Sequence, residues 1–377
     1  MGHVVDVGIV LLSHHGCWDD AAYAEANGFA TAGFVDSPLI AGDPFVAMAL
    51  TAQRTSKMRI GPMLAIPSNR NSASCVTAVA SVNRIAPGRT FLGIGTGFTG
   101  RAVFGLKALP AARLAQYAHD CRDLLDGREI LYRDGDRVQP IRLAHVPDRY
   151  VNTTDIPVYV AADGPKALKA AGAHGDGWIT TLQYSHFMES SPDVLATTRQ
   201  IVQASAAEMG RAMEDPYIMC SVGFCVLEDG ESPTSPRVLE HVGAYGMMPF
   251  HAYADNPAIG DHLPPAVQDR LDVYEREVLS RLDVPSDRRY QQVHRGHLSH
   301  LVHGEAAVLT DEIVRMTTLT GTAEEIVTVL RRLQAAGLKN IALNPPPHLV
   351  RETVRMYADE IAPRLSEASR RHGAPER

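Results

Sequence analysis

The chain has 377 residues, of which 45% are hydrophobic and 21% are charged. These proportions are typical of a globular protein with a large core, and they exclude a mostly disordered chain. The formal net charge is −7 and Lys and Arg do not cluster, so the sequence offers no basic surface for a nucleic acid or an anionic membrane.

The first residues, MGHVVDVGIVLL, lack the basic region, the apolar core and the cleavage site of a secretory signal. No stretch approaches the roughly 18 consecutive apolar residues of a membrane span. We therefore expect a cytoplasmic protein with no membrane partner. The five cysteines are scattered and form no C-x-x-C pair, which predicts reduced, mostly buried thiols.

Short runs rich in Val and Ile alternate along the chain with longer segments of helical periodicity. The runs predict eight strands, at residues 4–12, 32–35, 58–65, 90–94, 156–161, 178–182, 217–227 and 340–343. The segments between them predict helices at 18–27, 44–54, 73–85, 111–125, 165–173 and 193–209, then a helix opened by the capping-box pair Thr322 and Glu325, and a last helix at 349–365. Strict alternation over eight strands favours a closed (β/α)8 barrel, the TIM barrel, over an open doubly wound sheet.

Two segments interrupt this alternation. Residues 127–155 are polar and rich in turn residues, and we expect a surface excursion there. Residues 228–309, after the seventh strand, contain many Pro, Gly, His and Asp residues and one predicted helix at 265–282. So long an insertion in a compact domain is usually functional. We expect one barrel domain over residues 1–377, with the insertion as part of it.

Two glycine-containing turns follow predicted strands. The first, Gly-Thr-Gly-Phe-Thr-Gly at 95–100, satisfies the dinucleotide-binding pattern, but it follows the fourth strand instead of the first, and a structural tight turn is an alternative. The second, Ala-Ala-Asp-Gly-Pro-Lys at 161–166, lies between a strand and a helix. There the free amides from Lys166 onward and the helix dipole predict a phosphate site, and an ordinary capped helix start is the alternative.

The residues around these turns resemble the luciferase-like monooxygenase superfamily. The matching pieces are RIAPGRTFLGIGTG at 84–97, IPVYVAADGPKALKAAGAHGDGWI at 156–179, LTGTAEE at 319–325 and Asp-Ser-Pro at 36–38. The branch that the chain resembles most is that of the F420-dependent methylenetetrahydromethanopterin reductases, whose relatives include FMN monooxygenases. The resemblance implies a cofactor over the mouth of the barrel, near Thr96 and Gly97, with its phosphate at Asp163, Gly164, Pro165 and Lys166.

The resemblance also implies a bulge with a non-prolyl cis peptide at the end of the third strand. The sequence there, Ala-Ile-Pro-Ser-Asn-Arg at 65–70, departs from the usual Thr-Asn-Pro.

Histidines are the candidates for proton transfer and substrate contact. His14 and His15 follow the first strand, at the end of a barrel where catalytic residues lie, although a surface loop is the alternative. His294, His297, His300 and His303 recur at a spacing of three, which predicts one side of a helix if the segment is helical. We place His294 and His297 in a substrate pocket; an exposed helix face and metal binding by two of the four are alternatives, and no carboxylate completes a metal motif.

Two arginines are candidates for binding an anionic group. For Arg70 and for Arg295, the alternative to anion binding is an ordinary surface salt bridge. We retain Arg70 as the candidate for binding the substrate.

The resemblance implies three possible functions. The one that we put first is oxygenation of a small organic substrate with reduced FMN from a separate flavin reductase, with His14 or His15 as the proton donor. The second is hydride transfer from reduced F420, regenerated by an F420-reducing system, without oxygen. The third is a flavin-binding barrel without catalysis. The resemblance also makes a homodimer possible.

Overall fold

Eight parallel strands form the centre of the molecule. The computed structural model describes residues 5–144, 149–182 and 186–366, so Val4, the first residue of the first predicted strand, lies outside the described residues. The strands of the sheet are β1 (Asp6–Leu12), β2 (Thr31–Val35), β3 (Arg59–Pro62), β4 (Leu92–Ile94), β7 (Val158–Ala161), β8 (Gly177–Thr180), β9 (Tyr217–Val222) and β12 (Asn340–Leu343).

The sheet closes into a barrel. Its strands adjoin in the order β3-β2-β1-β12-β9-β8-β7-β4. Isolated parallel bridges from Ile60 to Thr90 and from Ala65 to Ile94 then join the segments of β3 and β4 at the two ends of that order. The predicted (β/α)8 barrel is therefore confirmed, and each predicted strand supplies one barrel strand.

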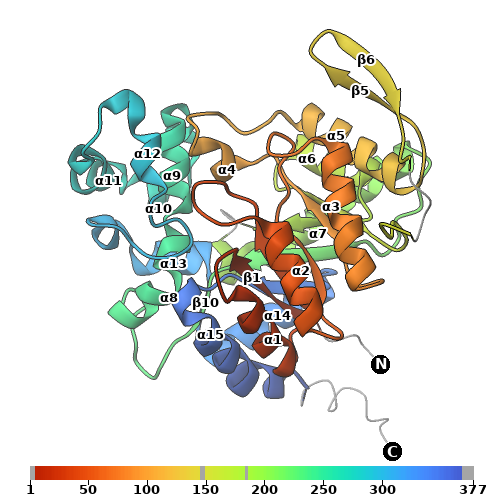
Figure 1. The fold of residues 1–377 in the computed structure, drawn as a ribbon. Coiled ribbons are helices and arrows are strands. Elements are labelled where there is room, and N and C mark those ends of the chain that lie inside the picture. The colour runs from red at the N-terminus through yellow and green to blue at the C-terminus, as the bar shows by residue number, and fades with distance from the viewer. Residues whose placement is uncertain (1–4, 145–148, 183–185, 367–377) are drawn as a thin grey trace, which may run out of the picture.

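Helices surround the barrel (Figure 1). The helices around the barrel are α1 (Cys17–Ala26), α2 (Pro44–Arg54), α3 (Ser72–Ile85), the short α4 (Phe98–Ala102), α5 (Ala111–Leu125), α6 (Pro165–His174), α7 (Ser191–Glu208), α14 (Ala323–Ala335) and α15 (Val350–Met356). Their starts follow from the sequence. The Asp43 side chain caps α2 ahead of Pro44, and Thr322 and Glu325 form the predicted capping box of α14. Among the described residues, no helix is both long enough and apolar enough to cross a membrane.

Alternation along the strands divides the buried residues into two clusters. On β1, Ile9 and Leu11 belong to the large cluster between the strands and the surrounding helices, whereas Val10 belongs to a small cluster with Phe91, Tyr159 and others. The small cluster draws on most of the barrel strands, which identifies it as the filling of the barrel interior. The interior is thus a packed core and not a channel.

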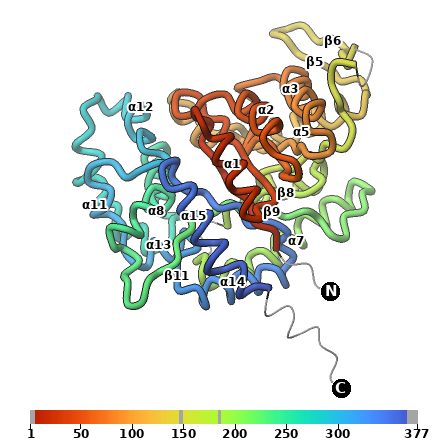
Figure 2. Tube along the Cα trace, turned by 60° about the horizontal axis from the view of Figure 1, so that its bottom comes forward, coloured from red at the N-terminus to blue at the C-terminus, as the bar shows by residue number. Residues whose placement is uncertain are grey.

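The predicted surface excursion at 127–155 contains an antiparallel hairpin, formed by β5 (Ile130–Asp134) and β6 (Arg137–Ile141). Gly135, in the turn between them, has a positive φ of 56°, a backbone conformation that glycine adopts without strain. The hairpin projects from the body of the molecule in both views (Figures 1 and 2). It lies far from the insertion after the seventh strand.

The seventh predicted strand, at 217–227, is wrong in its extent. β9 ends at Val222, and after Gly223 a separate strand, β10 (Phe224–Val226), leaves the barrel and pairs in parallel with β11 (Leu319–Gly321). A Cβ at Gly223 would lie 3.0 Å from the Cβ of Tyr245, so a larger residue would crowd the helix packed there. A run of apolar residues does not reveal this division because both strands are buried.

The insertion at 228–309 is more helical than predicted. It contains α8 (Pro236–Gly246), α9 (Met248–Asp255), α10 (Pro265–Gln268), α11 (Leu271–Glu277) and α12 (Tyr290–Val293), and α13 (Asp311–Thr317) follows it. The single predicted helix at 265–282 is replaced by α10, α11 and a 3-10 turn. Arg270 lies at the break between α10 and α11. Its side chain donates a hydrogen bond to the carbonyl of Val308, at 3.1 Å. The break thus coincides with a contact between distant segments, which helical periodicity does not reveal.

The insertion has a hydrophobic cluster of its own. Phe250 on α9 and Tyr274 on α11 are fully buried, with ring centroids 5.4 Å apart, and Val238, Val267 and Ile313 belong to the same cluster. In both views α8, α11, α12 and α13 lie together at one side of the barrel (Figures 1 and 2). This cluster lets the insertion hold a defined wall beside the barrel mouth.

Candidate active site

A pocket with a volume of about 460 Å³ opens at the mouth of the barrel. Every barrel strand contributes to its lining, near its carboxyl end or just beyond it, through Val10, Val35, Leu64, Thr96, Ala162, Thr180, Ser221 and Asn344. The insertion adds Tyr245, Met248, His297 and Leu298. Barrel enzymes place their chemistry at this end of the strands, so this pocket is the candidate active site.

The floor of the pocket is the packed interior of the barrel. Val10, Val35, Met63 and Ile179 belong to the interior cluster and also line the pocket. Such a floor is apolar and rigid. It can support a planar ring system and exclude water from one of its faces.

The end of β3 carries the irregular backbone that the resemblance implies. The peptide bond between Met63 and Leu64 is cis, directly before the segment whose sequence departs from Thr-Asn-Pro. The glycines after β4 pack against this segment: a Cβ at Gly95 would lie 2.6 Å from Leu64 Cδ1, and a Cβ at Gly97 would lie 2.5 Å from Ile66 Cγ2. Packing against the segment after β3 therefore explains these glycines. Thr96 and Gly97 also line the pocket, and their predicted contact with a cofactor stays a prediction.

The start of α6 forms one edge of the pocket. Gly164 lines the pocket and is the N-cap of α6; no described side chain caps the helix. The first helical hydrogen bond runs from the Leu168 amide to the Gly164 carbonyl at 3.0 Å, so the amides of Lys166 and Ala167 precede the helical ladder. A Cβ on Gly164 meets no described atom within 4 Å, and Pro165 and Lys166 are exposed beside it. This edge can bind an anion such as a phosphate.

Asp163 lies at the same edge, but its carboxylate is occupied by the end of β8. It accepts hydrogen bonds from the Thr180 hydroxyl and, at 3.0 Å each, from the amide and the hydroxyl of Thr181. Asp163 therefore joins the loop after β7 to the strand beside it. Its predicted part in binding a cofactor stays a prediction, and through these bonds it would act by positioning the pocket wall.

Asp36 is a pocket residue to which the sequence attached no role. It follows β2, is 6% exposed, and accepts a hydrogen bond from the Ile66 amide at 3.2 Å. Burial raises the pKa of its carboxyl group above the ordinary value, although the hydrogen bond from Ile66 opposes this. A buried carboxyl with a raised pKa in a cleft is a candidate for proton transfer.

The two candidate histidines after β1 lie apart. His14 is half-buried and lines a second pocket of about 420 Å³, together with His294 and Arg295. Its Nδ1 donates to the His15 carbonyl at 2.8 Å, and its Nε2 is buried without a partner among the described residues. His15 is exposed, packs edge-on against Trp18, and belongs to the lining of neither pocket.

Arg70 is engaged away from the candidate active site. Its guanidinium forms an ion pair with Asp43 and lies over the Phe45 ring, 4.9 Å from the ring centroid. Asp43 also caps α2, so the pair links that helix to the segment after β3. Neither pocket has Arg70 in its lining. The structure thus contains the salt bridge that the sequence analysis gave as the alternative. Substrate binding by Arg70 stays a prediction.

His294 and His297 are buried, as a pocket role requires, but they do not lie on a helix. α12 ends at Val293, and both residues lie in the turns that follow it. His297 lines the larger pocket; burial and the neighbouring His251 and His294 hold the pKa of its imidazole well below the ordinary value. The sequence pattern missed His251 on α9, because it is distant in sequence and has no regular spacing from the others. His300 and His303 are exposed.

Comparison with known proteins connects this site to a family. The family model described as luciferase-like monooxygenase matches residues 18–340. The chain is 22% identical over 324 residues to 5,10-methylenetetrahydromethanopterin reductase of Archaeoglobus fulgidus, a match that covers 84% of this chain and 86% of that protein. It is 35% identical over 150 residues to F420-dependent glucose-6-phosphate dehydrogenase of Mycobacterium tuberculosis, which covers 37% of this chain and only 43% of the relative.

Solved structures share the fold. The coenzyme F420-dependent tetrahydromethanopterin reductase from Methanopyrus kandleri has a TM-score of 0.68 at 18% identity, over 96% of this chain and 99% of that chain. The oxygenating constituent of 3,6-diketocamphane monooxygenase from Pseudomonas putida, in complex with FMN, has a TM-score of 0.63 at 14% identity, over 96% and 98%. Because the family model spans most of the chain, this protein belongs to the luciferase-like monooxygenase family, whose members are flavin-dependent or F420-dependent oxidoreductases.

Proposed function

We propose that this protein transfers a hydride from reduced F420 to a small organic substrate bound in the mouth of the barrel. The observation that carries the proposal is the combination of an apolar pocket floor with an uncapped helix N-terminus at the pocket edge. A tricyclic cofactor with a phosphate-bearing tail needs both features. We put F420 ahead of FMN because the two relatives compared above by sequence are a 5,10-methylenetetrahydromethanopterin reductase and an F420-dependent glucose-6-phosphate dehydrogenase.

The residues of the pocket fit such a cofactor. Bound F420 supplies the hydride. Val10 and Ile179 on the floor would support the ring system and keep water from it, while the amides of Lys166 and Ala167, with the Lys166 ammonium, would hold the phosphate. A volume of about 460 Å³ lies within the roughly 300–1,000 Å³ that small-molecule sites occupy.

Reduction of a substrate by a hydride also requires a proton. Asp36 is the group that we assign to this step, because burial keeps its carboxyl protonated to a higher pH than an exposed aspartic acid. His14 remains the histidine candidate, since it lines the second pocket, its Nε2 has no partner among the described residues, and its Nδ1 is fixed by a hydrogen bond. We place His14 ahead of His15 for this reason.

A reduced-FMN monooxygenase is the second candidate. The observation that favours it is the insertion, which forms a wall of the first pocket and contributes His294 and Arg295 to a second pocket of about 420 Å³, space that suits a bulky substrate. In either case a separate system must supply the reduced cofactor, a flavin reductase for FMN or an F420-reducing enzyme. We also propose that the protein is located in the cytoplasm and that it forms a homodimer.

Equilibrium titration of the purified chain with F420 and with FMN, followed by their fluorescence, tests the proposal. We expect F420 to bind at least about tenfold more tightly than FMN, a difference of about 1.4 kcal/mol. Tighter binding of FMN would favour the monooxygenase if, in addition, reduced FMN consumes oxygen faster with the protein than without it. Binding of neither would contradict all three functions, whereas binding without turnover of the reduced cofactor would leave the flavin-binding barrel without catalysis.

A further inference from the structure

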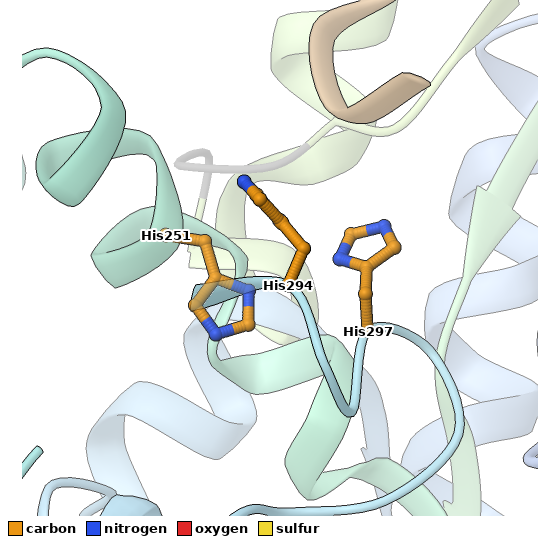
Figure 3. Close-up of side chains that lie close together, drawn as sticks. All are labelled: His251, His294 and His297. Atoms are coloured by element: carbon orange, nitrogen blue, oxygen red, sulfur yellow. The ribbon is translucent and has the colours of Figure 1, made fainter. Parts of the chain in front are cut away.

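Three buried histidines meet in the insertion. His251 lies on α9, and His294 and His297 lie in the turns after α12 (Figure 3). Each offers one ring nitrogen, and the three nitrogens lie within 4.8 Å of one another. The exposed fractions of the three residues are only 2–4%. Histidines separated in the chain are thus brought together by the folding of the insertion.

The cluster leaves three polar atoms without partners. The Nδ1 atoms of His251, His294 and His297 are buried, and none has a hydrogen-bond partner among the described residues. Leaving a buried polar atom unsatisfied is unfavourable, and native proteins contain few such atoms. Three of them on adjacent rings indicate a missing ligand that accepts electron pairs from nitrogen.

Two carboxylates orient the rings from the opposite side. The Nε2 atom of His251 lies 2.8 Å from Glu305 Oε1, and the Nε2 atom of His294 lies 3.0 Å from Asp255 Oδ2. Glu305 is 2% exposed, and its second oxygen accepts from the Val302 amide at 2.7 Å. Carboxylates that accept from the outer nitrogen commonly orient metal-binding histidines, because they fix the tautomer in which Nδ1 carries a lone pair.

We propose that His251, His294 and His297 bind one divalent transition-metal ion, of the class of Zn²⁺, through their Nδ1 atoms. Neutral imidazoles are ligands that Zn²⁺ and its neighbours in the first row prefer. The charge also balances, since one divalent cation compensates the two carboxylates of Asp255 and Glu305 beside the cluster. With Zn–N bonds of about 2.0–2.1 Å, tetrahedral ligand nitrogens lie about 3.4 Å apart, so the rings close by about 1 Å around the ion.

The site has a consequence for the barrel mouth. The ion joins α9 to the turns that carry His297 and Leu298, and both of these residues line the larger pocket. Metal binding therefore fixes part of the substrate wall. Three protein ligands leave a fourth position for water or for a ligand from that side. This inference holds whether the barrel binds F420 or FMN.

The alternative is a pair of protonated histidines. His251 and His294 would then each form an ion pair with its carboxylate and bind no metal. In that state every Nδ1 of the pair carries a hydrogen, and each of these donors is buried without an acceptor among the described residues. Protonation thus gives partners to the Nε2 atoms of the two histidines and leaves their Nδ1 atoms without partners. A metal ion bound by the Nδ1 atoms gives both kinds of nitrogen a partner.

Metal titration of the full chain tests the proposal. After treatment with a chelator and dialysis, the protein is titrated with Co²⁺ and with Zn²⁺. We expect one equivalent of Co²⁺ per chain with the visible absorption of a four-coordinate ion, displacement of Co²⁺ by Zn²⁺, and a higher Tm with Zn²⁺. His294→Ala should abolish stoichiometric binding. His300→Ala is the matched control, because His300 belongs to the same segment and is exposed.

Glu305→Gln keeps the test decisive if a histidine variant fails to fold. This change keeps the shape of the side chain and removes its charge, so we expect metal affinity to fall about 10–100-fold while the protein stays folded. The proposal is overturned if the folded wild-type chain binds no stoichiometric metal, if its Co²⁺ spectrum is that of the hydrated ion, or if His300→Ala weakens binding as much as His294→Ala.

Discussion

Asp36 shows how a single residue acquires a chemical property from its surroundings. It is the residue directly after β2, and the chain places its carboxyl between the Ile66 amide and the apolar pocket floor. Burial favours the neutral form, so the pKa of the carboxyl lies above its ordinary value. The same burial that shapes the pocket therefore supplies a candidate proton donor.

Asp36→Asn should reduce the rate of turnover by about 10²–10⁴-fold, the usual contribution of a general acid. The wild-type rate should fall as the pH rises through the raised pKa of Asp36, and the variant should lack this decline. A pH profile of kcat measures both effects. The raised pKa means that folding is less favourable once the carboxyl ionises, so the variant, whose amide oxygen still accepts from Ile66, should not be less stable at pH 7. An unchanged pH profile would exclude Asp36 as the donor.

Asp163→Ala removes three hydrogen bonds that hold the end of β8 to the loop after β7. Because this aspartate is largely exposed, we expect a loss of about 1 kcal/mol in the free energy of unfolding, measured with urea, and weaker cofactor binding. Asp163→Asn keeps an oxygen for the Thr181 amide and should recover much of the loss. Unchanged stability and unchanged cofactor binding in Asp163→Ala would show that these bonds do not position the pocket wall.

The sequence analysis predicted some of the residues that line the pocket and missed others. Thr96, Gly97, Asp163 and Gly164 line the pocket, because they lie shortly after strand ends and the carboxyl ends of barrel strands meet; their predicted contact with a cofactor stays a prediction. The same reasoning applied to the residue after β2 would have found Asp36. His251 offered no such signal, because its proximity to His294 and His297 depends on the tertiary packing of the insertion.

Among the elements, β10 and α8 form the base of the insertion, and one ion pair fastens them. Glu231 pairs with Arg237 and also accepts from the Ser235 hydroxyl at 2.7 Å, while Arg237 donates to the Val226 carbonyl at 2.8 Å. The hydrogen bond from Arg237 lowers the pKa of Glu231 to about 2. The ionised carboxylate therefore contributes to the stability of this junction at neutral pH.

Glu231→Gln should lower the free energy of unfolding by about 1–3 kcal/mol at pH 7, as expected for hydrogen bonds to a charged group. A depressed pKa gives stability that is complete above the unfolded value near 4.5 and is lost as the pH falls toward 2. The difference between wild type and variant in urea midpoints should therefore shrink over that range. Glu228→Gln is the control, since Glu228 is 77% exposed and 3.8 Å from Arg237. A difference that persists at low pH would rule out this origin.

Sequence periodicity predicted the helices and strands whose limits depend on residues close together in the chain. α2 begins at Pro44 and α14 follows the cap Thr322, both as predicted, because helix starts depend on residues adjacent in sequence. The division of the seventh strand, the separate pair β10 and β11, and the short helices of the insertion depend on contacts between distant segments. The break near Arg270, which bonds to the carbonyl of Val308, is one such contact.

The molecule combines a closed barrel with an insertion that adds a wall at the barrel mouth. The barrel supplies the apolar floor and the start of α6, and the insertion supplies His297 and Leu298 from the side. Closure of the barrel was predictable because eight alternating strands satisfy a known geometry. The shape of the wall was not, because it follows from the packing of Phe250, Tyr274 and their neighbours.

The affinity for F420 of the wild-type chain and of variants at the start of α6 tests most directly whether this helix holds the cofactor. Lys166→Glu reverses a charge beside the uncapped amides, and Gly164→Val adds a side chain where no described atom lies within 4 Å, so the fold should tolerate both. We predict that each weakens binding about tenfold or more. Lys169→Glu makes the same charge change further along α6 and should have little effect. Equal affinity of all four proteins would contradict a phosphate site at this helix.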